Sequence, residues 1–204
     1  ESTLAAKNFI QNAGTGTTQF DNAVTLSEGM DYNGTNLNLN AALNAGTNVS
    51  ITNSGTFTTN AAGAIVATGT FTQDGLGTST LSGDITTTNN NISFGKAITL
   101  SGDVAMSSGA GAGTMTFSDS IDATGDHGQS LALTAGTGDI NFDNAVGATT
   151  DLKDITIVSA KNVDTESTLA AKNFIQNAGT GTTQFDNAVT LSEGMDYNGT
   201  NLNL

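Results

Sequence analysis

The chain has 204 residues, with 19 Asp and Glu against five Lys and no Arg, so its formal net charge is −14, and it contains no Cys, Pro or Trp. Five scattered lysines cannot neutralise many phosphates, which excludes nucleic-acid binding by charge. The absence of Cys excludes disulfides and zinc held by thiolates. No apolar run reaches the ~20 residues with which a helix crosses a bilayer, so no membrane span is expected.

An identical internal repeat organises the chain. Glu1 to Leu39 returns letter for letter as Glu166 to Leu204, at an offset of 165 residues. Such an identity indicates recent tandem duplication. We therefore divide the chain into one full repeat unit, residues 1–165, and the start of the next identical unit, residues 166–204, and interpret it as a window of a longer tandem array. Each added unit carries 15 acids and four lysines, a net charge of −11.

A shorter period lies inside the long one. The hexapeptide TLSGDI at Thr80–Ile85 returns as TLSGDV at Thr99–Val104, and AGTGTTQFDNAV at Ala13–Val24 returns as AGTGDINFDNAV at Ala135–Val146. Together with looser copies, these matches define a sub-repeat of 19 to 25 residues. That length is typical of one coil of a β-solenoid and too short for a self-contained domain.

Short strands with one buried face are predicted along the whole chain. Apolar residues alternate with Thr, Ser or Asn in bursts of three to five residues, the pattern of a half-buried strand. Gly, Asn, Asp and Ser separate the bursts and favour sharp turns. The alternating pairs are, in chain order, Leu37/Leu39, Val49/Ile51, Ile92/Phe94, Ile98/Leu100, Val104/Met106, Met115/Phe117, Leu131/Leu133, Ile140/Phe142 and Ile155/Ile157.

These strands favour an all-β fold, a right-handed parallel β-helix (β-solenoid) with about 19–25 residues per coil. The absence of Pro agrees with strands that have a neighbour on both sides, since Pro would remove a ladder hydrogen bond there. Tandem β-sandwich repeats are the alternative, although sandwiches have longer strands and usually a Trp or Tyr in the core. A propeller would need a recurring blade motif of ~40–45 residues, which the chain lacks.

Four phrases carry a family resemblance: GTGTTQFDNAVTL, LSGDITTTNNNISFGKAITLSGDV, GAGAGTMTFSDSI and SLALTAGTGDINFDNAV. They resemble the repeat regions of large bacterial exoproteins, the filamentous-haemagglutinin-like, two-partner-secreted adhesins and related β-strand-repeat surface proteins. The resemblance covers the whole chain and rests on composition and rhythm. It implies a right-handed parallel β-helical shaft, export across the outer membrane, and a role as an adhesin or matrix fibre.

His127 is the one histidine, in the sequence ATGDHGQ. As a catalytic site, it would be a general base oriented by Asp126, with Ser130 or Ser120 as the nucleophile. Adjacent residues rarely form such an oriented pair, and no nucleophile-elbow signature accompanies them. We therefore interpret His127 as part of an exposed, glycine-rich corner and assign no catalytic residue.

Calcium is the metal that this chain's oxygen ligands would suit. Aspartates recur at related corners, and stacked coils could bring two of them together, but neither the calcium nonapeptide nor an EF-hand loop is present. The alternative is that Asp and Asn cap turns through side-chain-to-backbone hydrogen bonds, so we assign no metal or cofactor site. The residues in question are Asp84, Asp103, Asp119, Asp122, Asp139 and Asp143.

Ice binding and carbohydrate binding are two chemistries known for β-solenoids. Ice binding needs a strict T-x-T in every coil, whereas the Thr bursts cluster between Thr56 and Thr88, where high β-propensity explains them. Carbohydrate binding or cleavage needs gathered carboxylates and aromatic platforms. The chain has two Tyr, Tyr32 and its duplicate Tyr197, and its nine Phe mostly fall at inward positions, for example Phe94 and Phe117.

We therefore expect a non-enzymatic structural segment, the rigid shaft of a long extracellular adhesin or filament at a bacterial cell surface. The partner expected first is the chain itself, through end-to-end continuation or lateral packing. Host, cell or mineral surfaces or polysaccharides would be bound through parts outside these residues. A self-assembling matrix filament and a carbohydrate-binding or carbohydrate-cleaving β-helix are the alternatives.

Overall fold

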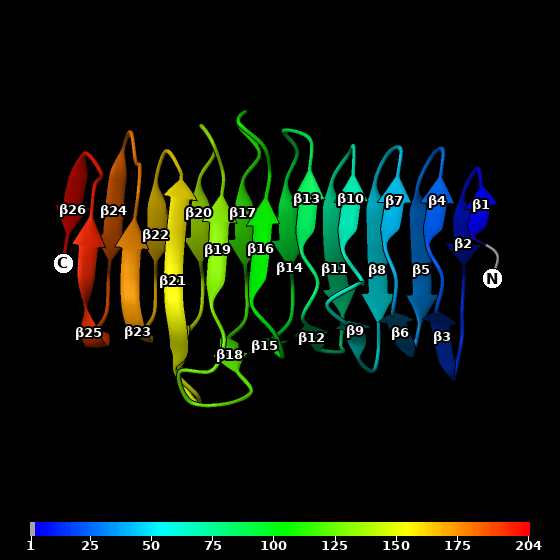
Figure 1. The fold of residues 1–204 in the computed structure, drawn as a ribbon, viewed down its shortest axis with the longest axis horizontal. Coiled ribbons are helices and arrows are strands. Elements are labelled where there is room, and N and C mark those ends of the chain that lie inside the picture. Colours follow the sequence, from blue (N-terminus) through cyan, green and yellow to red (C-terminus); the bar gives the residue numbers. More distant parts are fainter. Residues whose placement is uncertain (1–2) are drawn as a thin grey trace.

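A computed structural model describes residues 3–204 as a parallel β-solenoid of about ten coils (Figure 1). Within these residues, 26 strands form three sheets and there is no helix. Accordingly, no helix in this part of the chain is long and apolar enough to cross a membrane. The early coils contribute one strand to each sheet in turn, whereas the later coils continue the third face through an isolated bridge and the beginnings of longer strands. The two ends of the chain lie at opposite ends of the stack (Figure 1).

Sheet 1 has ten strands, most of three to five residues. They are β1 (Leu4–Ala6), β4 (Val24–Leu26), β7 (Leu43–Ala45), β10 (Ile65–Ala67), β13 (Ile85–Thr87), β16 (Val104–Ser107), β19 (Leu131–Thr134), β21 (Leu152–Ser159), β23 (Leu169–Gln176) and β25 (Val189–Tyr197). The last three strands are longer because each continues around a corner from sheet 3 into sheet 1.

Sheet 2 also has ten strands, and sheet 3 has six. The strands of sheet 2 are β2 (Phe9–Gln11), β5 (Met30–Gly34), β8 (Val49–Asn53), β11 (Phe71–Gly75), β14 (Ile92–Phe94), β17 (Met115–Phe117), β20 (Ile140–Phe142), β22 (Val163–Thr165), β24 (Thr182–Phe185) and β26 (Asn201–Asn203). Those of sheet 3 are β3 (Thr17–Phe20), β6 (Asn36–Leu39), β9 (Phe57–Thr59), β12 (Ser79–Leu81), β15 (Ile98–Leu100) and β18 (Ile121–Ala123).

All strand pairs between these coils are parallel, so the expected solenoid is confirmed and the alternative of antiparallel sandwich modules is wrong. Most coils have lengths within the predicted range: Leu4 pairs with Val24, and Val24 with Leu43. One coil is longer than predicted, because Val104 pairs with Leu131, 27 residues later. The extra residues form the corner that contains His127, between β18 and β19.

The predicted inward positions fill the core. Every alternating pair named from the sequence lies on a strand with both members buried, while the residue between them faces outward. Phenylalanines stack from coil to coil, with ring centroids of Phe71 and Phe94 5.2 Å apart and those of Phe117 and Phe142 5.3 Å apart. Phe9 and Phe20 of the first coil are only partly buried, since nothing covers them on one side.

Candidate functional site

The aspartates considered as calcium ligands bind backbone instead. Five of the six accept a hydrogen bond from a backbone N–H group, four of them from a residue one coil further along the chain. The four pairs are Asp84 with Ala105 at 2.8 Å, Asp103 with Ser130 at 2.8 Å, Asp122 with Thr149 at 2.8 Å and Asp139 with Asn162 at 3.1 Å. The capping interpretation is confirmed, but the bonds join successive coils and not residues of one turn.

Asparagines at the corners act in the same way. The side-chain oxygen of Asn36 accepts from the Thr56 N–H at 2.9 Å, and that of Asn48 accepts from the Thr70 N–H at 2.9 Å. At a corner the backbone leaves the sheet, so its N–H groups lose their ladder partners and need another acceptor. Hydrogen bonding at the corners therefore accounts for these Asn and Asp positions.

The His127 corner is the one group of His, Asp and Glu within residues 3–204 whose ligand atoms converge as a metal site would require. Ligand atoms of Asp126, His127 and Asp151 lie within 4.8 Å of one another. His127 Nδ1 is 3.5 Å from Asp126 Oδ1, and its Nε2 is 3.6 Å from Asp151 Oδ2. The hydroxyl of Ser192 lies 3.3 Å from Nε2. His127 is partly exposed and has a positive φ of 54°.

The sequence did not indicate Asp151 or Ser192. Asp151 is 24 residues after His127, one coil along, so the coil period could have suggested it, whereas Ser192 is 65 residues away. Neither Ser120 nor Ser130 has a hydrogen bond to His127 within residues 3–204; their backbone N–H groups bind Asp119 and Asp103. The nucleophile–base pairing inferred from neighbouring residues is therefore not the one in the structure.

The chemistry open to this corner is modest. The Ser192–His127 distance is just beyond the range for a base that activates a hydroxyl, and Asp151 approaches the same ring nitrogen. One imidazole nitrogen and two carboxylate oxygens could hold a divalent cation at the surface. All the groups come from exposed or partly exposed residues, so water competes for each contact.

The threonine bursts form a short outward ladder. Thr58, Thr80 and Thr99 pair across β9, β12 and β15 of sheet 3. Asn38 precedes this column and Asp122 follows it, so the column spans three coils. Ice binding through stacked T-x-T rows is not supported by a single column of that length.

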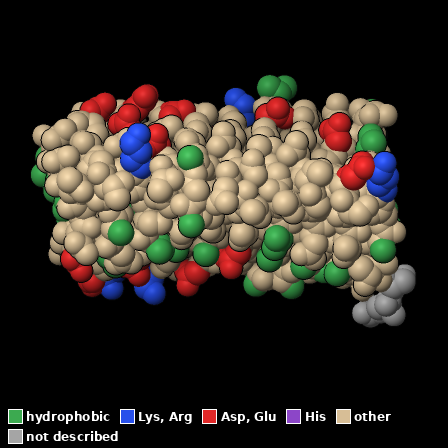
Figure 2. All heavy atoms as spheres, turned by 90° about the horizontal axis from the view of Figure 1, so that it is seen from above, with side chains coloured by type: hydrophobic (Ala, Val, Ile, Leu, Met, Phe, Trp, Pro, Cys, Tyr) green, Lys and Arg blue, Asp and Glu red, His purple; other side chains and the backbone are tan. Residues whose placement is uncertain are grey.

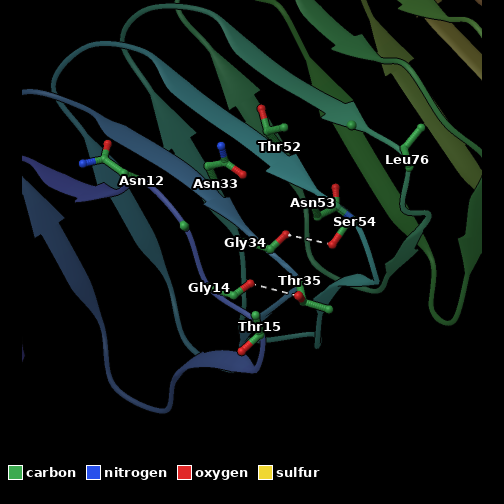
Figure 3. A pocket seen from close by; sticks show the side chains of 12 residues that line it. Asn12, Gly14, Thr15, Asn33, Gly34, Thr35, Thr52, Asn53, Ser54 and Leu76 are labelled. Carbon is green, nitrogen blue, oxygen red and sulfur yellow. Dashed lines mark hydrogen bonds between the residues drawn. The ribbon is translucent and has the colours of Figure 1, made fainter.

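A polar hollow of about 420 Å³ lies where sheet 2 turns into sheet 3 (Figure 3). Residues from four successive coils, mostly Asn, Thr, Ser and Gly, line it, with Asn12, Asn33 and Thr52 at its rim. The Thr35 hydroxyl donates to the Gly14 carbonyl at 2.9 Å, which joins two coils across the floor. Leu76, 84 % exposed, closes one end. No charged or aromatic side chain lines this hollow.

Charged side chains on the face in Figure 2 lie mainly along its two long edges, with an uncharged polar band between them. One charged cluster occurs twice, because Lys7 pairs with Glu28 at 2.9 Å and its duplicate Lys172 pairs with Glu193 at 2.8 Å. The hydrogen bond from Lys7 lowers the pKa of Glu28, and the bond from Asn8 lowers it further. The same contact raises the pKa of Lys7.

The chain was compared with protein-family models, curated proteins and solved structures, and none of them matched. The fold therefore rests on the strand pairing, and function has to be argued from the stack itself.

Proposed function

We propose that this chain is a structural segment of a long extracellular fibrous protein and serves as the rigid shaft of a bacterial cell-surface adhesin or filament. The observation that carries this proposal is the uninterrupted pairing of two ten-stranded sheets over about ten coils, with a third sheet of six strands beside them. Interaction between neighbouring coils repeats along the axis, so length is gained by adding similar interfaces.

The contacts between coils suit a load-bearing rod. Neighbouring coils are held by backbone ladders on two faces throughout and on the third face over six coils, by apolar side chains inside, and by Asn or Asp bonds at corners. Parallel strands lie ~4.8 Å apart, so extension of the rod requires many bonds to break together. The resemblance to filamentous-haemagglutinin-like exoproteins supports the placement of such a rod outside a bacterial cell.

The surface charge suits a shaft that stays separate from its neighbours. The chain carries a net charge of −14, and like charges repel over a Debye length of about 8 Å at physiological ionic strength. The absence of Cys also suits passage through a secretion pore as an unfolded chain, since no disulfide can form early.

The test is to image proteins that contain one and two 165-residue units by electron microscopy. Each added unit should lengthen the particle by about 37 Å, from seven and two-thirds coils at ~4.8 Å, with no change in width. Particles that become wider, or strings of separate globules, would refute the shaft.

A self-assembling filament is the second candidate, in which solenoid coils of one copy stack on those of another. The 204-residue chain offers two coil surfaces on which this stacking can be tested. A hollow of about 510 Å³ at the carboxyl end is lined by Phe185, Val189, Leu191 and Met195, among others. At the amino end Leu4 is 38 % exposed and Phe9 and Phe20 are partly exposed. Open sheet edges beside apolar ends are sites where a second copy can add.

Sedimentation of the 204-residue chain over a range of concentrations tests this second candidate. Self-assembly through the ends predicts fibres that Met195→Lys abolishes and that the control Thr99→Lys, an outward change on β15 in the interior of the stack, preserves. A monomer at all concentrations, or equal effects of the two variants, would reject end-to-end assembly.

A further inference from the structure

The two identical segments of the chain lie on different faces of the solenoid. In the first copy, β1 belongs to sheet 1, β2 to sheet 2 and β3 to sheet 3. In the second copy, Leu169 continues sheet 3, since it pairs with Val146, which pairs in turn with Ile121 of β18. The next residues, Phe174–Gln176, pair with β21 in sheet 1, and β24 belongs to sheet 2. Each segment of the second copy therefore lies one sheet back from its duplicate in the first copy: sheet 3 in place of sheet 1, sheet 1 in place of sheet 2, and sheet 2 in place of sheet 3.

The displacement follows from the number of strands in one unit. Seven pairings along sheet 1 lead from Leu4 in β1 to Ile157 in β21. Two further faces, β22 in sheet 2 and then sheet 3, bring the chain to Leu169, the duplicate of Leu4. One unit of 165 residues therefore makes seven and two-thirds coils.

Local structure is kept in spite of the change of face. The Thr18 hydroxyl donates to Gln11 Oε1 at 2.7 Å, and the duplicate bond from Thr183 to Gln176 is also 2.7 Å long. The Lys–Glu pair, the Asn–Glu bond beside it and the Tyr bond to a backbone carbonyl also occur in both copies. The segment thus carries its side-chain contacts to whichever face it occupies.

The corner at Lys7 and Asn8 is where the two copies differ. In the first copy these residues separate β1 from β2 and turn the chain from sheet 1 to sheet 2. In the second copy Lys172 and Asn173 lie inside the continuous strand β23, where the register shifts by a bulge between sheets 3 and 1. A bulge and an open corner bend the chain by different amounts, so one sequence fits two corners of the cross-section.

We infer that successive units of a tandem array are turned by one face, a third of the way around the shaft, and that the array repeats after three units, or 23 coils. A patch that each unit carries once, such as the Lys7–Glu28 cluster, is then presented on three sides in turn. This inference rests on the proposed shaft. It deepens the proposal, because a shaft built in this way offers the same surface in three directions and not along one side.

Nitroxide labels test the displacement in the 204-residue chain. The chain has no cysteine of its own, so the labels attach only to the introduced cysteines. Thr156 and Ile175 are outward neighbours in sheet 1, and Asp164 and Gln184 are outward neighbours in sheet 2. The pairs Thr156→Cys with Ile175→Cys, and Asp164→Cys with Gln184→Cys, should each show strong dipolar broadening in the EPR spectrum. Asp164→Cys with Ile175→Cys, which lie in different sheets, should not.

The outcomes separate this inference from the shaft. Broadening of Asp164→Cys with Ile175→Cys, and none of Thr156→Cys with Ile175→Cys, would overturn the displacement and leave a stacked solenoid. The absence of broadening in all three pairs would overturn both, because the second copy would then not stack on the first.

A three-unit protein extends the test to the array. A gold label on one cysteine per unit, at Thr99 and its duplicates, should appear on a different sheet in each unit of a cryo-EM reconstruction. Labels on one sheet of a straight rod would refute the turn and keep the shaft, and labels on a particle that is not a rod would refute the shaft as well.

Discussion

Polar side chains at the corners join successive coils, in addition to the apolar core. Asn36 and Asp103 each accept an N–H group from the next coil, at 2.9 Å and 2.8 Å. In the buried interior, Gln73 Nε2 donates to Asn53 Oδ1 at 2.6 Å, and Asn53 Nδ2 donates to the Gly55 carbonyl at 2.8 Å. These bonds replace the hydrogen bonds to water that the backbone and side-chain groups lose on folding.

Asn36→Ala tests a corner bond. The change leaves the Thr56 N–H without its acceptor, so the free energy of unfolding should fall by about 1 kcal/mol. Asn38→Ala on the same strand is the control. Asn38 also faces outward, but it lies within β6 and not at the corner, so its replacement should cost less. Urea denaturation of both variants measures the difference, and equal losses would contradict the role of the corner bond.

The duplicated ion pair gives a pH prediction with an internal control. The folded-state pKa of Glu28 is lowered by the hydrogen bond from Lys7, so its stabilising contribution is present above the ordinary carboxyl range and lost as the pH falls through the folded-state pKa. Lys7→Ala should therefore raise the pKa of Glu28 and leave that of Glu193 unchanged. NMR titration of the two carboxyl groups decides this, and a parallel rise at Glu193 would contradict it.

At the scale of the element, each strand is a short inward–outward–inward unit whose stability depends on its neighbours. Phe117 stacks between Phe94 and Phe142, at centroid distances of 6.1 Å and 5.3 Å. Phe20 of the first coil is only partly buried and contacts Phe9 edge to face at 5.1 Å. Phenylalanine side chains therefore contribute differently to the free energy of unfolding, according to their position along the stack.

Phe117→Ala should cost about 3–5 kcal/mol, the usual range when a buried Phe is truncated, because the cavity would lie between two filled coils. Phe20→Ala should cost clearly less, since water and relaxation of the end coil can fill the space. Chemical denaturation compares the two variants. Equal costs would mean that the end coil is as well packed as the interior.

At the scale of the whole molecule, the two copies of one sequence provide a direct measure of position. Leu4 is 38 % exposed whereas its duplicate Leu169 is fully buried. The reason is that β1 has a neighbour on one side, whereas Leu169 of β23 lies between Val146 and Val189 of β25. Stability in such a stack is a sum of interfaces and falls toward the ends.

Hydrogen exchange should reveal that difference in chemically identical residues. The amide of Ala171 should exchange more slowly than that of its duplicate Ala6, because strand pairs on both sides protect it. NMR resolves the two amides. Equal rates would show that the ends do not fray before the interior opens.

The sequence by itself determined the all-β class, the coil period, the inward residues such as Phe94 and Phe117, and the capping use of the aspartates. These features repeat at short range, with a period of two along a strand and about 21 along the coils, so spacing predicts them. Only the tertiary structure decided the approach of Ser192 to His127 and the face on which each copy lies. Both depend on the summed bends of all the corners in between, and a corner such as Lys7–Asn8 has the same letters whether it turns the chain or continues a strand.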